Sequence, residues 1–158
     1  MKTIGMIVLG LGVIGVLVFV SQCPCGPMPG AWLVGEEADA PVSDWSFVND
    51  REAVPLCQLQ VTTWRPHSIN LNCMSEGGRL FVSCSNCADK RWSNDALTHP
   101  NGHLRAGSLV YPVEMHRVMA DEQLDSAWAA RLRKVGGDPS PRPDHWWSFE
   151  LTSRAGAG

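Results

Sequence analysis

The chain begins with a long uncharged segment, which runs from Thr3 to Val20. As a helix at about 1.5 Å per residue it would reach about 27 Å, close to the thickness of a bilayer core. Lys2 is the only charged side chain before it, and the first charged residues after it are Glu36 and Glu37. The positive-inside rule therefore places the N-terminus in the cytoplasm. We expect a single-pass transmembrane signal anchor over residues 1–22, with the rest of the chain periplasmic or extracellular.

Two other interpretations of this segment stay open. A cleaved signal peptide needs a small-x-small cleavage site, and Val20-Ser21-Gln22 matches that pattern poorly. A lipoprotein would be acylated at Cys23, yet Gln22 stands where a small residue is expected. The length of the apolar run favours the uncleaved anchor.

The remainder of the chain is long enough for one ordinary domain with a single core. Residues 23–31 combine Pro and Gly in a way that ends a helix, so residues 23–44 are expected to be a linker and N-terminal extension. The folded domain is expected over residues 45–154. A net charge of −3, with 13 basic and 16 acidic residues and no basic stripe, argues against nucleic acid as a partner.

Alternating apolar residues on either side of a TWRPH turn predict a β-hairpin. If the turn centres on Arg65, Cys57 lies directly opposite Cys73, and that distance is close to what a disulfide needs. The same register pairs Leu59 with Leu71 and Val61 with Ile69. An oxidising compartment favours the bridge, although two reduced core cysteines are the alternative.

The rest of the domain alternates between strand and helix patterns. A third strand over residues 79–84 would extend the hairpin into a three-stranded meander. A short helix capped by Asp89 would bury Trp92, Ala96 and Leu97 and end at Pro100. A hairpin over residues 103–118 turns at Gly107-Ser108, with Pro112 indicating an edge or bulge. A helix capped by Asp121 runs over residues 122–135 to Gly136 and Gly137, and a last strand ends the domain. The chain is thus mainly β with two helices (α+β), and its mostly antiparallel strands suggest a small barrel behind the transmembrane helix.

Lys90 and Arg91 lie at the start of the predicted short helix. A helix N-terminus offers unpaired N–H groups and partial positive charge, so two added cations make a pocket suited to a phosphate. Basic side chains that are only solvated are the alternative.

The segment from Pro66 to Val118 resembles the flavin- and deazaflavin-binding split-barrel superfamily, which includes pyridoxamine phosphate oxidases and deazaflavin-dependent nitroreductases. The resemblance rests on PHSINL, GGRLFVSCSNCADKRW, ALTHPNGHLRAG and VYPVEMHRV. It implies that one strand contacts FMN or a deazaflavin, that a polar turn follows the next strand, and that a basic pair holds the cofactor phosphate. It also implies that the domain is a small split β-barrel and that the protein is a homodimer. The cofactor-binding residues that it implies are His67, Ser68, Asn70, Ser83, Ser85, Asn86, Lys90 and Arg91.

The two cysteines of CSNC, Cys84 and Cys87, allow a zinc site, a redox pair or a small disulfide. Zinc would need two more ligands, and no second CxxC is present, so no metal site is expected. The βαβ pattern of thioredoxin-like proteins is also lacking. A structural bridge or inert thiols are favoured.

Three functions follow from these patterns. The first is a membrane-anchored reductase that uses FMN or a deazaflavin. The second is a cofactor-free envelope binding or structural module, which the replacement of the family's usual Arg by the His67-Ser68 region favours. The third is a thiol redox protein acting through Cys84 and Cys87. No catalytic residue is assigned.

Overall fold

The computed structural model describes residues 10, 12, 14, 32–64 and 67–156. In these residues, one eight-stranded sheet combines with two α-helices and two short 3-10 helices. The elements are β1 (Glu36–Glu37), η1 (Ser46–Asn49), β2 (Cys57–Val61), β3 (His67–Leu71), β4 (Cys73–Glu76), β5 (Arg79–Ser85), η2 (Cys87–Asp89), α2 (Arg91–Thr98), β6 (Asn101–Ala106), β7 (Leu109–Arg117), α3 (Asp121–Val135) and β8 (Trp146–Ser153). The expected mainly β architecture with two helices is confirmed.

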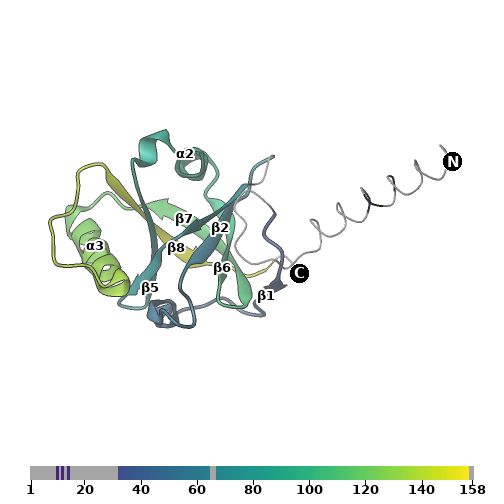
Figure 1. Ribbon diagram of the computed structural model, residues 1–158, viewed down its shortest axis with the longest axis horizontal. Coiled ribbons are helices and arrows are strands. Elements are labelled where there is room, and N and C mark those ends of the chain that lie inside the picture. Colours follow the sequence, from purple (N-terminus) through teal and green to yellow (C-terminus); the bar gives the residue numbers. More distant parts are fainter. Residues whose placement is uncertain (1–9, 11, 13, 15–31, 65–66, 157–158) are drawn as a thin grey trace.

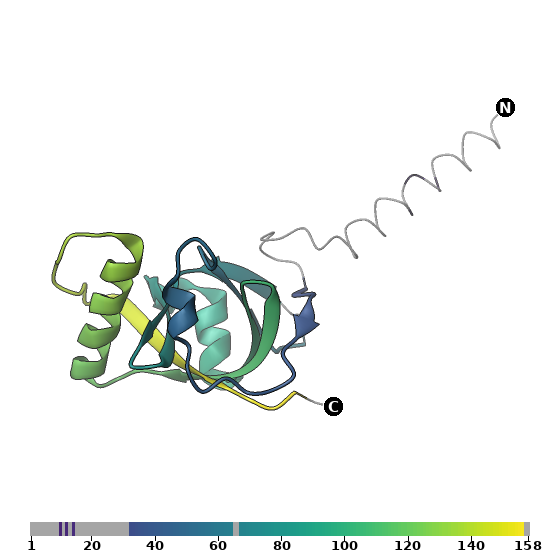
Figure 2. The ribbon, with the colours of Figure 1, turned by 90° about the horizontal axis from the view of Figure 1, so that it is seen from below.

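The sheet curls until its two edges meet. The strand order is β3-β2-β6-β7-β8-β5-β4, with β1 added in parallel to β7. β3 and β4 are therefore the two ends of this order, yet only Asn72 separates them in the chain. Because one residue connects the two edges, the sheet must close on itself into a barrel that stays split between β3 and β5, as the curvature in Figures 1 and 2 shows.

The barrel interior and the outer face of the sheet each hold an apolar cluster. Inward-facing side chains of β2, β6, β7 and β8, including Leu59, Leu104, Val113 and Phe149, fill the barrel at 0% exposure. α2 packs Trp92 and Ala96 against this core. α3 lies beside the sheet (Figure 1) and forms the second cluster with the outward-facing residues of β4, β5 and β8. α2 thus lies at one end of the barrel and α3 along its wall.

The expected three-stranded meander is wrong because β5 pairs with β4 and β8 and does not pair with β3. β3 pairs with β2, whereas β4 pairs with β5 through a hairpin whose turn holds Gly77 and Gly78 at positive φ. Asn72 carries the chain from one edge of the barrel to the other. Alternation of apolar residues identifies a strand but does not specify which strand it pairs with. In the sequence, β3, Asn72 and β4 therefore look like one continuous strand.

The hairpin register also differs from the expected one. Cys57 pairs with Leu71, and Val61 pairs with His67, which shifts the register by two residues. A shift of two keeps every side chain on its predicted face, since the period of a strand is two. The expected disulfide between Cys57 and Cys73 nevertheless forms, with Cα atoms 5.7 Å apart. It joins β2 to the first residue of β4 and so bridges the line where the barrel closes.

In neither helix does the predicted cap residue occupy the N-cap position. Asp89 belongs to η2, and Lys90 precedes α2 without a side-chain cap. Asp121 is the first residue of α3, so Ala120 holds the cap position. Trp92 and Ala96 are buried as expected, but Leu97 is 48% exposed, so its assignment to the core is wrong. Gly136 ends α3 as predicted, with a left-handed φ of 70° that glycine adopts without strain.

The hairpin expected over residues 103–118 is confirmed as β6 and β7, which pair across Gly107 and Ser108. Pro112 lies in β7, an interior strand. The missing N–H of Pro112 would point away from β6. On that side, β7 pairs with β1 up to Val110 and with β8 from Val113 onward. Pro112 therefore occupies a local break between two partners, which explains how an interior strand accepts it.

The expected anchor over residues 1–22 lies outside the described residues, apart from Gly10, Gly12 and Ile14. In the described parts of the chain, no helix is long and apolar enough to cross a bilayer. Of the expected linker and extension, residues 32–44 are described. Trp32 is 69% exposed, whereas Trp45 is 2% exposed and belongs to the barrel core.

Lys134 is a buried cation that the sequence pattern did not indicate. It is 5% exposed, and its Nζ donates a hydrogen bond of 2.5 Å to the carbonyl of Val48. Burial, together with the charge of Arg51, lowers the pKa of Lys134 from 10.5 to about 8. The side chain connects α3 to η1. Its ammonium group has little access to water, which disfavours the charged form.

This lowered pKa predicts that stability rises in mild alkali. Between pH 8 and pH 10 the unfolded chain holds the Lys134 proton and the folded chain releases it, so the free energy of unfolding should increase by roughly 2–3 kcal/mol. Urea unfolding across this range measures it. In the Lys134→Met variant the increase should disappear, and an equal increase in the variant would contradict the assignment.

Candidate functional site

A cleft follows the split of the barrel. β3 pairs with β2 on one side only, and β5 loses its partner β4 after Val82. The free edges of both strands line a cavity of about 360 Å³, which we call the split cleft. It is lined by Ile69, Asn70, Leu71, Asn72, Ser83, Cys84, Ser85, Lys90, Trp92, Arg131 and Trp146. Backbone N–H and C=O groups that no strand satisfies thus border the cleft.

The charged side chains of the split cleft are both cations. Lys90 reaches it from the start of α2, and Arg131 reaches it from α3. No carboxylate lines the cleft, and among the described residues none forms an ion pair with either cation. The guanidinium of Arg131 lies 5.1 Å from the centre of the Trp128 ring. This arrangement attracts an anion.

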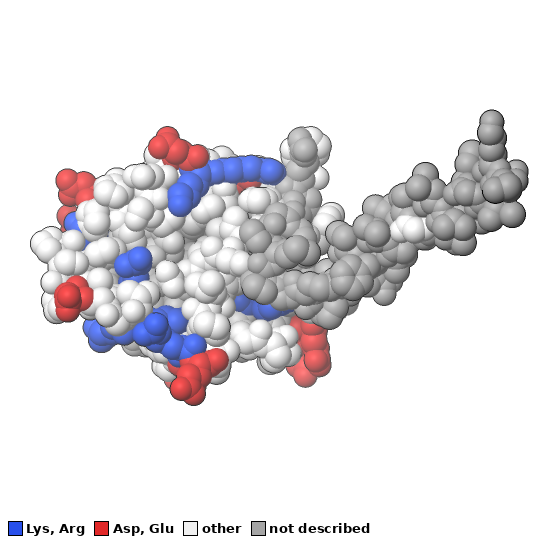
Figure 3. Space-filling model, viewed as in Figure 1, with Lys and Arg blue, Asp and Glu red and all other residues white. Residues whose placement is uncertain are grey.

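Charged side chains of both signs lie elsewhere on the molecule. On the face that Figure 3 shows, basic and acidic side chains alternate around the molecule and form no continuous basic stripe. Several cations elsewhere are already paired, such as Arg79 with Glu150 and Arg142 with Asp125. Lys90 and Arg131 differ from these because no carboxylate neutralises them within the described chain.

Trp146 lines the cleft and carries a buried indole donor. The residue is 2% exposed and its ring packs at 75° against Trp128, with 5.2 Å between centroids. Its indole Nε1–H is buried and has no acceptor among the described residues. A buried donor without an acceptor costs free energy, so a ligand that accepts this hydrogen bond would gain affinity from it.

The segment that carries Lys90 is held by side chains of α2. The hydroxyl of Ser93 lies within hydrogen-bond distance of the carbonyls of Cys87 and Lys90, at 2.5 and 2.9 Å, and can donate to either. The amide of Asn94 donates to the carbonyls of Ala88 and Lys90, at 2.8 and 3.0 Å. Two polar side chains of the first helical turn thus hold the backbone from Cys87 to Lys90 in place at the end of the cleft.

Four of the eight predicted cofactor-binding residues line the split cleft: Asn70, Ser83, Ser85 and Lys90. The other four are placed elsewhere. Ser68 is fully buried and accepts a hydrogen bond from Gln58, and Arg91 pairs with Asp95 at 3.3 Å. His67 lies opposite Val61 where β3 begins, and Asn86 precedes η2 in a left-handed conformation.

The sequence did not assign Arg131, Trp92 or Trp146 to the site. Arg131 did carry a signal, since it falls on the apolar stripe of its helix, where a cation is unusual. The position of the Arg131 side chain depends on where α3 packs against the sheet, and hydrophobic periodicity does not specify that.

The cysteines of CSNC form a disulfide whose Cα atoms are 5.5 Å apart. The bridge expected for Cys84 and Cys87 is therefore present, and Cys84 lines the split cleft. In the described residues, no group of three or more His, Cys, Asp or Glu side chains could hold a metal ion.

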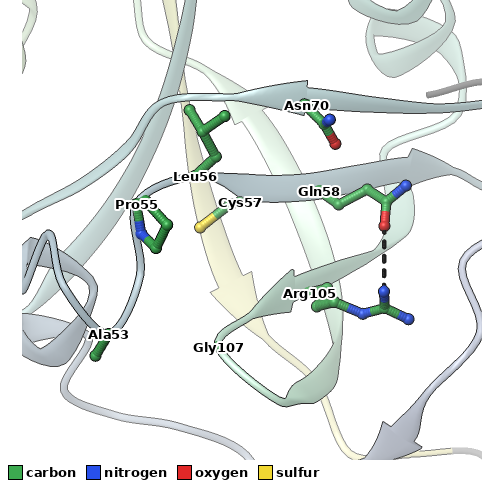
Figure 4. A pocket seen from close by; sticks show the side chains of 8 residues that line it. All are labelled: Ala53, Pro55, Leu56, Cys57, Gln58, Asn70, Arg105 and Gly107. Carbon is green, nitrogen blue, oxygen red and sulfur yellow. Dashed lines mark hydrogen bonds between the residues drawn. The ribbon is translucent and has the colours of Figure 1, made fainter. Parts of the chain in front are cut away.

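A second hollow of about 250 Å³ lies on the outside of β2, β3 and β6 (Figure 4). Its wall is mostly apolar, with Ala53, Pro55 and Leu56 on one side. The guanidinium of Arg105 lies at the other side and donates to Gln58 Oε1 at 3.5 Å, the contact drawn as a dashed line in Figure 4. Among the described residues, Asn70 is the only predicted cofactor-binding residue that lines it.

Solved structures of very different sequence share this fold. A candidate pyridoxamine 5′-phosphate oxidase from Listeria innocua matches 68% of the chain and 88% of its own length, with a TM-score of 0.55 and 8% identity. A candidate 5-nitroimidazole antibiotic resistance protein from Bacteroides thetaiotaomicron matches 72% and 82%, with a TM-score of 0.54 and 9% identity. A conserved hypothetical protein from Mycobacterium tuberculosis matches 77% and 86%, with a TM-score of 0.56 and 11% identity.

No protein-family profile matches the sequence, and no curated protein is significantly similar to it. At the identities above, the structural likeness establishes the fold. The chain shares the split-barrel fold of these structures, and the resemblance stated from the sequence is confirmed at the level of the fold.

Proposed function

We propose that the split cleft binds a flavin-type cofactor, FMN or a deazaflavin, and that the protein acts as a reductase. One observation carries the proposal: two free strand edges and two cations without carboxylate partners border a single cleft. The fold shared with a candidate pyridoxamine 5′-phosphate oxidase supports it.

The free edge of β3 matches the polar end of a flavin. The pyrimidine part of the ring presents alternating carbonyl and N–H groups, which pair with a strand edge much as a neighbouring strand would. Asn70 adds an amide at the same edge. When bound, the cofactor supplies hydride transfer, and the protein supplies binding and orientation.

Lys90 and Arg131 are the residues that would hold the cofactor phosphate. Both line the cleft, whereas Arg91, the second member of the predicted basic pair, donates to Asp95. The hydroxyls of Ser83 and Ser85 lie on the same wall and can donate to phosphate or ribityl oxygens. A volume of about 360 Å³ is at the lower end of the range for small-molecule sites.

Absorbance and fluorescence titrations of the purified chain test the proposal. FMN and a phosphorylated deazaflavin are added separately, and the quenching of their fluorescence is followed. We expect saturable binding of one of them. A protein that leaves both spectra unchanged at saturating concentration would contradict the proposal and favour the cofactor-free module.

Exposed tryptophans favour that second candidate function. Trp32 and Trp64 are 69% and 88% exposed, and solvent-exposed indoles are typical of contact surfaces. In this alternative the barrel is an envelope binding or structural module that uses no cofactor.

We also propose that residues 1–22 anchor the domain on the outer side of the membrane, and that the domain forms a homodimer. The uncharged run from Thr3 to Val20 supports the anchor. Alkaline extraction of membranes tests it, because an anchored chain stays in the pellet. Sedimentation of the detergent-solubilised chain tests the dimer, which a monomeric mass would contradict.

A further inference from the structure

The Cys84–Cys87 disulfide lies on the wall of the split cleft. Cys84 belongs to the part of β5 that has lost its partner β4, and it lines the cavity. Cys84 is partly exposed, whereas Cys87 is buried at 0% exposure. Of the two cysteines, Cys84 is therefore the one that borders the cleft, whereas Cys87 is buried.

The other disulfide is built differently. Cys57 and Cys73 are 1% and 0% exposed inside the barrel core, and they are 16 residues apart in the chain. Cys84 and Cys87 are only 3 residues apart. Because a shorter loop constrains the unfolded chain less, the second disulfide contributes less to stability than the first. Stability therefore does not explain why the Cys84–Cys87 disulfide lies on the cleft.

Hydrogen bonds, in addition to the sulfur–sulfur bond, hold the turn around Cys87. Ser93 and Asn94 hold the backbone from Cys87 to Lys90, and the Lys90 N–H donates to the Cys87 carbonyl at 3.0 Å. Cys87 Sγ lies 2.7 Å from the carbonyl oxygen of Cys84, so a reduced Cys87 already has an acceptor for its thiol proton. These contacts would hold the turn if the sulfur–sulfur bond opened.

We propose that the Cys84–Cys87 disulfide is a second redox centre, which exchanges electrons with the flavin-type cofactor of the split cleft. This inference rests on the proposed function. The disulfide accepts two electrons and two protons from the fully reduced cofactor. The S–S bond breaks, each sulfur gains one hydrogen atom, and the cofactor is left oxidised. The reverse step forms the bond and returns both hydrogens. The substrate class of the reductase thus includes a disulfide within its own chain.

Anaerobic mixing of the oxidised full chain with limiting reduced cofactor tests this exchange. Photoreduced FMN and a reduced phosphorylated deazaflavin are used as separate probes. Recovery of the oxidised cofactor's absorbance is followed, and thiols are then alkylated and assigned to peptides by mass spectrometry. We expect one labelled Cys84/Cys87 pair for each cofactor molecule oxidised. The Cys57–Cys73 bridge should stay unlabelled and serves as an internal control.

The variant Cys84→Ser with Cys87→Ser separates the two hypotheses. It should abolish the recovery of oxidised absorbance, and its affinity for each probe is measured in parallel. If the wild-type chain binds a probe but leaves it reduced and Cys84 and Cys87 unlabelled, the redox exchange is overturned and the proposed function survives. If the chain binds neither probe, both are overturned.

Discussion

Replacing Lys90 with alanine should weaken the binding of FMN by roughly tenfold, since a charge-assisted hydrogen bond to phosphate is worth on the order of 1.5–3 kcal/mol before solvent exposure reduces it. Lys90 lines the split cleft and pairs with no carboxylate among the described residues. Riboflavin, which lacks the phosphate, should bind the variant and the wild type equally well. Fluorescence titration with both ligands measures the difference.

Arg91→Ala is the matched control for this prediction. Arg91 is the neighbouring cation but pairs with Asp95 within α2, so its removal should change the affinity for FMN by less than about twofold. If Lys90→Ala weakens FMN and riboflavin by the same factor, Lys90 does not hold the phosphate. If Arg91→Ala weakens FMN binding more than Lys90→Ala does, the phosphate lies at Arg91 and not at Lys90.

Removing the Cys57–Cys73 disulfide should produce the largest loss of stability. The bridge closes a loop of 16 residues between β2 and β4, and a loop of this length predicts a loss of about 3 kcal/mol when both cysteines are replaced by alanine. It also joins the two sides of the line where the barrel closes. Urea unfolding of the double variant measures the loss.

The Cys84–Cys87 pair provides the control. Its loop is only 3 residues long, so the corresponding double variant should lose about 2 kcal/mol or less. Equal losses in the two variants would show that the Cys57–Cys73 bridge has no special role at the closure of the barrel.

The strands and helices of the fold could be predicted because each depends on local pattern. Alternation located β2, β3, β6, β7 and β8, and Gly136 marked the end of α3. The order of the strands could not be predicted. The crossing at Asn72 follows from how the sheet curls, and a one-residue connection between opposite edges has no signature in the sequence.

The register of the β2–β3 hairpin and the helix caps could not be predicted from local pattern either. A shift of two residues in the β2–β3 hairpin leaves the apolar face unchanged, so the hydrophobic pattern is equally satisfied by both registers. Asp89 is a good cap residue, but η2 incorporates it and moves the start of α2 beyond Lys90. In both cases the decision depends on backbone geometry that residue type does not determine.

Four of the eleven residues that line the split cleft were predicted from the resemblance. Asn70, Ser83, Ser85 and Lys90 lie in segments whose motifs resemble those of the superfamily, and they do meet at the split cleft. Arg131 and Trp146 arrive from α3 and β8, more than forty residues later in the chain. Their contribution depends on how α3 packs against the outer face of the sheet, which only the three-dimensional arrangement reveals.

A crystal structure of the domain soaked with FMN and, in parallel, with a phosphorylated deazaflavin tests the central claim most directly. The account predicts density for one ring system between β3 and β5, with its pyrimidine end against the free edge of β3 and its phosphate near Lys90 and Arg131. A ligand bound instead in the outer hollow beside Arg105, or a split cleft without ligand density in crystals saturated with either compound, would contradict it.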